Sequence, residues 1–192
     1  IYWYVENNEF VMNIFVLDQD PVRAAQLQCD KHVVKMVTES AQMLSTVHRV
    51  CDGKIEKRLS KANRKLNYWQ LDDSRERLLY KAVHVNHPCT LWTQETDSNY
   101  IWHYEHFIAL CKEYTYRYGK VHACEKLLSE ALEQLPQNIV KGKLTNFRLA
   151  MLANPECVFP DNPVKSYKLF YKTKRERFVM NWTKRNVPEW FL

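Results

Sequence analysis

The chain has 192 residues and a formal net charge of +6, and it combines 13% aromatic residues with only three glycines. This length predicts one domain built around a single core. Because many-stranded sheets need tight turns that glycine favours, we expect an all-α, mainly helical domain. No stretch is long and apolar enough to span a bilayer, so we expect no membrane partner. Six cysteines without a C-x-x-C pair predict reduced thiols in the cytoplasm.

The first 29 residues predict an arm followed by a short helix. Residues 1–11 precede Met12, where a natural chain could start, and we treat them as an N-terminal extension of a single helical domain over residues 12–192. Residues 12–17 are apolar and β-branched, which predicts a buried strand or an extended arm. Asp18 to Pro21 supplies an N-cap and a proline for a helix that ends near Cys29.

A long helix is predicted from Asp30, whose carboxylate can cap its start, to Arg49. Positions 32, 35, 39, 42, 46 and 49 follow the spacing of one helical face, and all of them are polar. Two interpretations stay open. The face is either the solvated side of an amphipathic helix, or a site in which Glu39 is a general acid or base beside the amine of Lys35 and the imidazole of His32.

The remaining pattern predicts further helices joined by irregular segments. In chain order, we expect a basic polar loop over Lys57–Asn67, a short helix over Ser74–Val83, an aromatic helix that Ser98 caps and Gly119 ends, an amphipathic helix over Glu125–Leu135, an irregular segment over 136–164 and a final helix over Val164–Arg177.

Basic residues gather in two segments. Residues 165–185 hold eight basic residues against one acid, and a second basic run extends from Lys54 to Lys65. The first segment also carries Tyr167, Phe170, Tyr171, Phe178 and Trp182, which suits a polyanion with bases that can stack. We therefore expect nucleic acid to be contacted by Arg49, Lys57, Arg58, Lys61, Arg64, Lys65, Lys172, Lys174, Arg175, Arg177, Lys184 and Arg185.

Two H-x-x-H pairs, His84/His87 and His103/His106, leave a metal-dependent enzyme as a further alternative. His87 precedes a proline in non-helical sequence, and the second pair has no carboxylate at ligand spacing except Glu105, which faces elsewhere. We therefore assign no metal ligands and expect no cofactor. The absence of P-loop, G-x-G-x-x-G and G-x-S-x-G motifs argues against nucleotide hydrolysis and serine hydrolysis.

Several segments resemble a family of bacteriophage-encoded proteins: Met-Asn-Ile-Phe-Val-Leu-Asp-x-Asp-Pro, Cys-Asp-Lys-His-Val-Val-Lys-Met, Asn-His-Pro, Tyr-Arg-Tyr-Gly-Lys-Val-His and Lys-Arg-x-Val-Pro-Glu-Trp-Phe. The first half also resembles the phage T4-type pyrimidine-dimer DNA glycosylases, small all-α enzymes also called endonuclease V. Their first long helix carries Asp-x-His and, seven residues later, the catalytic glutamate. Asp30, His32 and Glu39 share that spacing, and Asn86-His87 and Arg117 to Gly119 are loose counterparts of later landmarks.

The resemblance implies that Glu39 is the catalytic carboxylate and His32 a helper near the opened nucleotide. It also implies that the nucleophile is the α-amine of the N-terminal arm, at Met12 or its processed successor. The chain departs from the pattern at Thr38 and Gln42, where those enzymes carry arginines, and the extension before Met12 would displace the amine.

We therefore expect a phage DNA-processing protein of the host cytoplasm, with DNA favoured over RNA. Its expected activity is that of a DNA glycosylase and AP lyase on damaged or modified pyrimidines. Lys35 is the other candidate amine. A non-enzymatic nucleic-acid-binding protein is the alternative from a different class.

Overall fold

A computed structural model describes residues 12–60 and 62–192, and this part of the chain is mainly helical. The predicted extension over residues 1–11 and the predicted DNA contact Lys61 lie outside the described residues. The helices are α1 (Pro21–Gln26), α2 (Asp30–Asp52), α3 (Arg75–Leu78), α4 (Pro88–Glu95), α5 (Asp97–Tyr118), α6 (Ala123–Glu133) and α7 (Pro163–Lys172), with short 3₁₀ helices at Pro155–Cys157, Thr173–Glu176 and Glu189–Phe191.

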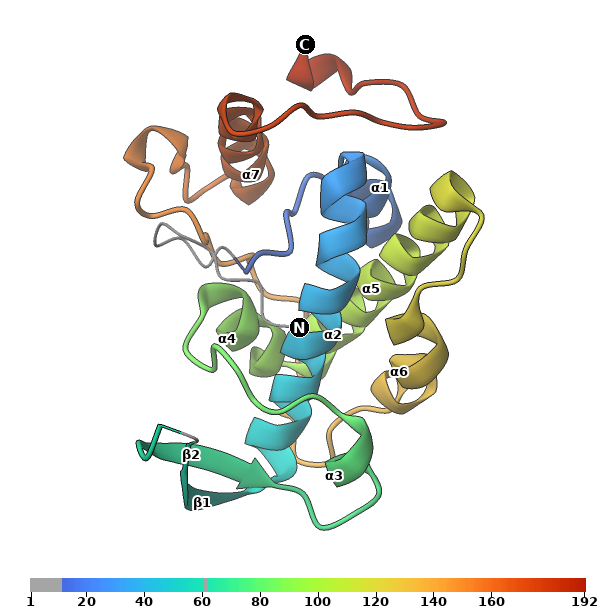
Figure 1. The fold of residues 1–192 in the computed structure, drawn as a ribbon. Coiled ribbons are helices and arrows are strands. Elements are labelled where there is room, and N and C mark those ends of the chain that lie inside the picture. The colour runs from blue at the N-terminus through green and yellow to red at the C-terminus, as the bar shows by residue number, and fades with distance from the viewer. Residues whose placement is uncertain (1–11, 61) are drawn as a thin grey trace.

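Helix α2 runs through the middle of the molecule, and α4, α5 and α6 pack around it (Figure 1). Of the six residues on its polar stripe, Lys35 alone is exposed, while Thr46 and Arg49 are buried. Thr46 Oγ1 bonds the carbonyl oxygen of Gln42 and accepts from the backbone nitrogen of Val83. A solvated face is therefore the wrong interpretation, because neighbouring segments enclose the stripe and supply its hydrogen-bond partners.

The residues that follow α2 form a β-hairpin rather than the predicted polar loop. Strands β1 (Lys54–Leu59) and β2 (Lys65–Gln70) pair antiparallel, with Lys54 opposite Gln70 and Leu59 opposite Lys65. The prediction followed the high charge of this segment, and neither strand shows the strict alternation of polar and apolar residues that would have indicated it. Gly53 allows the close turn, because a Cβ there would lie 2.5 Å from the carbonyl oxygen of Arg49.

The start of α2 differs from the prediction. Asp30 is the first helical residue rather than the cap, and the preceding Cys29 makes no side-chain capping bond. The Asp30 carboxylate instead accepts from Arg117 at 2.8 Å and from the backbone nitrogen of Thr183 at 2.9 Å. It therefore ties α2 to both α5 and the C-terminal segment. At the first helix, Asp20 is the N-cap as its sequence position predicts.

The C-terminal aromatics mostly belong to the core. Tyr167, Phe170, Tyr171 and Trp182 are all buried, so they do not offer rings to a nucleic acid and that prediction is wrong. Tyr167, Phe170 and Tyr171 follow the three-four spacing of an apolar face of α7 packed on the domain, and Trp182 belongs to the segment after it. Within the described ranges, no helix is both long and apolar enough to cross a membrane.

Several histidines lie inside the helical core. His103 bonds Thr93 Oγ1 at 2.7 Å and Ser40 Oγ at 3.1 Å, and His48 bonds the hydroxyl of Tyr100 at 2.8 Å. Burial lowers the pKa of His103 to about 3 and the pKa of His48 to about 4. His106, which is also buried, has its pKa lowered to about 4 for the same reason. These imidazoles are therefore neutral in the folded protein near pH 5.

We predict that acid unfolds the protein through these histidines. Between about pH 6.5 and 4 the unfolded chain binds protons that the folded core refuses, so the free energy of unfolding falls as the pH falls. Each buried histidine contributes about 1.4 kcal/mol per pH unit in this range. Urea unfolding at pH 7, 6 and 5 measures the slope. A free energy of unfolding that stays constant over this range would contradict the prediction.

Candidate functional site

The N-terminal arm brings a backbone nitrogen to the predicted catalytic carboxylate. Residues 12–17 form no strand, and they lie buried beside α2 as an irregular extended segment. The backbone nitrogen of Asn13 donates to Glu39 Oε2 at 3.3 Å. Met12 and Asn13 are both buried. The structure therefore brings together the arm and the glutamate, two features that the sequence places 26 residues apart.

Glu39 also pairs with Lys35. The Lys35 ammonium lies 2.9 Å from Glu39 Oε1, one turn away on the same helix, and its side chain is 56% exposed. Burial raises the pKa of Glu39, while Lys35 and the bond from Asn13 act in the opposite direction. Since burial has the larger effect, this carboxyl group binds a proton more readily than an ordinary glutamate. A carboxyl group with a raised pKa is better suited to act as a general acid than an ordinary glutamate.

His32 is held in one orientation by the C-terminal helix. Its Nδ1 lies 2.7 Å from the hydroxyl of Tyr171, which also accepts from the backbone nitrogen of Cys29 at 2.8 Å. The hydroxyl of Tyr171 thereby links the imidazole to the start of α2 and occupies its Nδ1. Burial, with help from Lys35 and Lys174, lowers the pKa of His32 to about 3. His32 is therefore a neutral imidazole, not a cation.

The arm holds a strained residue next to His32. Phe15 has a φ of +43°, a backbone conformation that residues other than glycine rarely adopt. Its ring stacks on the imidazole of His32, with 4.7 Å between the ring centroids. The backbone nitrogen of Phe15 donates to Asn13 Oδ1 at 2.8 Å, while Asn13 Nδ2 has no hydrogen-bond partner among the described residues. Backbone strain of this kind persists where surrounding contacts fix it, and it is frequent at functional sites.

The predicted nucleic-acid contacts separate into two surfaces and a buried group. Lys57, Arg58, Arg64 and Lys65 are exposed on the hairpin. Arg49 does not belong with them, because it is only 1% exposed. Its guanidinium donates to backbone carbonyl groups of β2 and α3 and to the Glu76 carboxylate, so it anchors the hairpin and the prediction that it binds nucleic acid is wrong.

The C-terminal basic residues are also divided. Arg175 and Arg177 are exposed and Lys172 is half-buried, whereas Lys174 is buried over the ring of Phe170. The prediction of a surface role for Lys174 is therefore wrong. Lys184 donates to the carbonyl oxygen of Tyr116 and Arg185 pairs with Glu113, and both attach the C-terminal segment to α5.

The expected nucleic-acid contacts left out two lysines of α7 that belong to the basic segment, the exposed Lys165 and the half-buried Lys168. Lys165 and Lys168 share a helical face with Lys172, and none of the three has an ion-pair partner among the described residues. Lys168 lies 5.6 Å from the ring of Trp190. The three-four spacing of these lysines was visible in the sequence. The position of Trp190 beside them was not, because it depends on how the chain end folds back.

The two histidine pairs do not form a metal site in the described part of the chain. Both ring nitrogens of His103 and of His106 are within bonding distance of protein groups, and His87 accepts from the backbone nitrogen of Cys89 as the N-cap of α4. In residues 12–60 and 62–192, no three His, Cys, Asp or Glu side chains gather where they could hold an ion.

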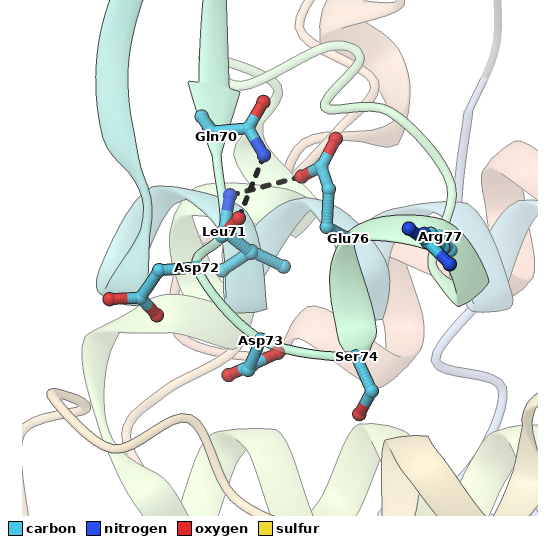
Figure 2. A pocket seen from close by; sticks show the side chains of 7 residues that line it. All are labelled: Gln70, Leu71, Asp72, Asp73, Ser74, Glu76 and Arg77. Atoms are coloured by element: carbon cyan, nitrogen blue, oxygen red, sulfur yellow. Dashed lines mark hydrogen bonds between the residues drawn. The ribbon is translucent and has the colours of Figure 1, made fainter.

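A hollow of about 600 Å³ lies at the far end of α2 from the arm and is lined by residues of the 70–77 segment (Figure 2). Glu76 points into this region, and its carboxylate accepts from the backbone nitrogen of Leu71 at 3.0 Å and from Arg49 at 2.6 Å. Because these partners use the carboxylate to hold the hairpin, we assign the hollow a structural role.

A scan of protein-family models, a search of curated proteins and a search of solved structures each gave no match to the chain.

We predict that Glu39→Gln stabilises the folded protein at pH 7 by about 0.5–2 kcal/mol, as substitutions of strained functional groups commonly do. Because burial raises the pKa of Glu39, the folded state still holds a proton at pH values where the unfolded state has lost it. The free energy of unfolding therefore falls as the pH rises from the pKa of an unfolded glutamate towards the pKa of Glu39 in the folded protein. Glutamine removes this cost. Urea unfolding at pH 7 and pH 4 should show a difference from wild type that shrinks at pH 4.

Glu130→Gln, at an exposed position on α6, is the matched control and should change the free energy of unfolding by less than about 0.5 kcal/mol. A Glu39→Gln variant that is clearly less stable than wild type at pH 7 would show that the carboxylate is a structural ion-pair partner.

Tyr171→Phe is predicted to lower the free energy of unfolding by about 1–3 kcal/mol, because it leaves the Cys29 nitrogen and His32 Nδ1 buried without their partner. Tyr114→Phe, at a half-buried ring on α5, is the control. Thermal or urea unfolding checks both. Equal stability of the two variants would mean that Tyr171 does not position His32.

Proposed function

We propose that the protein is a DNA glycosylase with AP-lyase activity that removes damaged or modified pyrimidines. The observation that carries the proposal is the 3.3 Å contact between the backbone nitrogen of Asn13 and Glu39 Oε2. In a chain that starts at Met12 and then loses it, this nitrogen is the α-amine. The two groups that an amine-dependent glycosylase needs, a nucleophile and a carboxylate, would then be in direct contact.

The chemistry follows from the properties of these groups. An α-amine has an ordinary pKa near 7.7–8.0, so a useful fraction is neutral at pH 7. The neutral amine attacks C1′ of the flipped nucleotide, a nitrogen–carbon bond forms, and the glycosidic bond breaks as the base leaves with its electron pair. The amine gives up a proton and the departing base gains one. Glu39, with its raised pKa, is placed to carry out these transfers.

Neighbouring side chains support that role. His32 is neutral, and because Tyr171 occupies its Nδ1, Nε2 is the ring nitrogen left to bond the substrate. The Lys35 ammonium is itself a weaker candidate for the nucleophile, since it is paired with the Glu39 carboxylate at 2.9 Å. Its more effective role is to attract the phosphate next to the reacting sugar.

The basic surfaces account for binding to DNA. The exposed cations of the hairpin and of α7 neutralise phosphates, which supplies affinity that does not depend on sequence and weakens as salt is added. A protein with only these surfaces would bind DNA without turnover. The buried carboxylate against the arm distinguishes the enzymatic proposal, because phosphate binding has no use for it.

The proposal is tested by borohydride trapping. The chain that begins at Asn13, released from a cleavable fusion, is incubated with duplex DNA that carries a pyrimidine dimer, an abasic site or a modified thymine. A covalent adduct is expected, with peptide mapping that places it at the N-terminal residue. Acetylation of the amine should abolish the adduct, and Glu39→Gln should lower its rate at least 100-fold, the size of a typical acid–base contribution.

An adduct at Lys35 would move the nucleophile to the helix and leave the reaction class intact. Absence of an adduct on all three substrates, together with salt-sensitive DNA binding, would replace the proposal with a non-enzymatic DNA-binding protein.

A further inference from the structure

The β-hairpin has an outer face with no partner among the described residues. Side chains alternate along a strand, so one face carries Ile55, Lys57 and Leu59 on β1 and Lys65, Asn67 and Trp69 on β2. Trp69, at the base, is half-buried, whereas the other five are exposed, and Ile55 and Leu59 expose 63% and 64% of their surface. Figure 1 shows the hairpin at the end of α2 opposite α7, extending away from the helical body.

The opposite face of the hairpin is braced. Tyr68 donates its hydroxyl to Glu76, and the Arg58 guanidinium lies 3.6 Å from the Tyr68 ring. At the base, Arg49 donates to the carbonyl oxygen of Trp69 at 2.9 Å and pairs with Glu76 at 2.6 Å. A two-stranded hairpin alone is marginally stable in water. These contacts therefore fix the hairpin on the helix that carries Glu39, with its outer face free.

We propose that this hairpin inserts its outer face into the major groove of duplex DNA beside the reacting nucleotide. The inference rests on the proposed DNA substrate but not on the chemistry at Glu39. The major groove is about 12 Å wide and admits a two-stranded ribbon, whose strands lie about 4.8 Å apart.

The outer face carries the side-chain types that major-groove edges bind. Lys65 can donate to the O6 and N7 acceptors of guanine. Lys57 donates to Asn67 Oδ1 within the hairpin, and these two side chains together present further donors to the base edges. Ile55 and Leu59 match the methyl group of thymine, the one apolar group in the groove. This mixture of cations, one amide and apolar groups also explains why aliphatic side chains stand exposed on a highly charged strand.

The charge of the hairpin favours DNA over a second copy of the protein as the partner of its outer face. Residues 54–70 hold six basic residues, Lys54, Lys57, Arg58, Lys61, Arg64 and Lys65, against Glu56 alone, which gives +5. A second copy of the hairpin would bring the same charge and be repelled. A polyanion gains from it, because each neutralised phosphate releases bound counterions.

The position of the hairpin sets where it meets the DNA. Ten residues of α2 separate Glu39 from the anchor Arg49, a distance of about 15 Å at 1.5 Å per residue. At 3.4 Å per base pair, the hairpin meets the duplex about four to six base pairs from the nucleotide at Glu39. The two contacts are joined by one helix, so their spacing is rigid.

The test compares two triple variants on a duplex with a tetrahydrofuran abasic analogue. Lys57→Ala, Arg64→Ala and Lys65→Ala should reduce the slope of log affinity against log salt by about 0.9 for each of the three cations that neutralises a phosphate, and by at most about 2.7. Lys112→Ala, Lys120→Ala and Lys126→Ala remove the same charge from exposed positions on and between α5 and α6 and should leave the slope within about 0.5 of wild type.

Dimethyl sulfate footprinting identifies the groove, because guanine N7 lies in the major groove. Wild type should protect guanines four to six base pairs from the abasic analogue, and the hairpin triple variant should not. Lys57→Arg with Lys65→Arg keeps the charge and should keep both the slope and the footprint, which separates lost contacts from a damaged hairpin.

Equal slopes for the two alanine variants, or no protected guanine with wild type, would overturn the groove-binding role. That result can occur while borohydride trapping succeeds, so it leaves the proposed reaction standing. A hairpin-dependent slope and footprint without any trapped adduct would instead support the DNA-binding role of the hairpin and refute the glycosylase.

Discussion

The burial of one carboxylate is the constraint on which the candidate site depends. Glu39 lies in the most enclosed helix of the domain, where loss of water raises its pKa and only an exposed ammonium from Lys35 and a backbone nitrogen from Asn13 compensate. A stable fold has no need of this arrangement, since an uncharged side chain would be easier to bury. The nearby strain at Phe15 has the same character. Both features concentrate where the arm meets α2.

Helix α2 connects the chemistry to the surfaces that surround it. Its first turn is tied through Asp30 to Arg117 of α5 and to the C-terminal segment, its middle carries Glu39, and its last turns anchor the hairpin through Arg49. Two of these ties are ion pairs with low exposure, in which removal of one partner leaves a buried charge alone. The basic hairpin and the basic face of α7 are therefore held at opposite ends of one rigid element (Figure 1).

The sequence was sufficient to predict the helical class and the long central helix. It also placed His32, Lys35 and Glu39 close together, because side chains three, four and seven residues apart share a helical face. It misassigned Arg49 and Lys174, which have the charge of surface residues but are buried against partners from distant segments. It also missed the hairpin, whose strands are rich in basic residues and lack strict alternation of polar and apolar side chains. The resemblance implies that the amine of the arm and Glu39 share a site, but the residues alone do not predict the contact between Asn13 and Glu39, since that contact depends on how the arm packs on α2.

The central claim is that an amine at Asn13 would touch the Glu39 carboxylate, and an NMR titration of the Glu39 side-chain carbon tests it most directly. The comparison uses the chain that begins at Asn13, the same chain with an acetylated amine, and the chain that begins at Ile1. An ammonium group in contact favours the ionised carboxylate, so the pKa of Glu39 should be lower in the first chain than in the other two. The same pKa in all three chains would contradict the account.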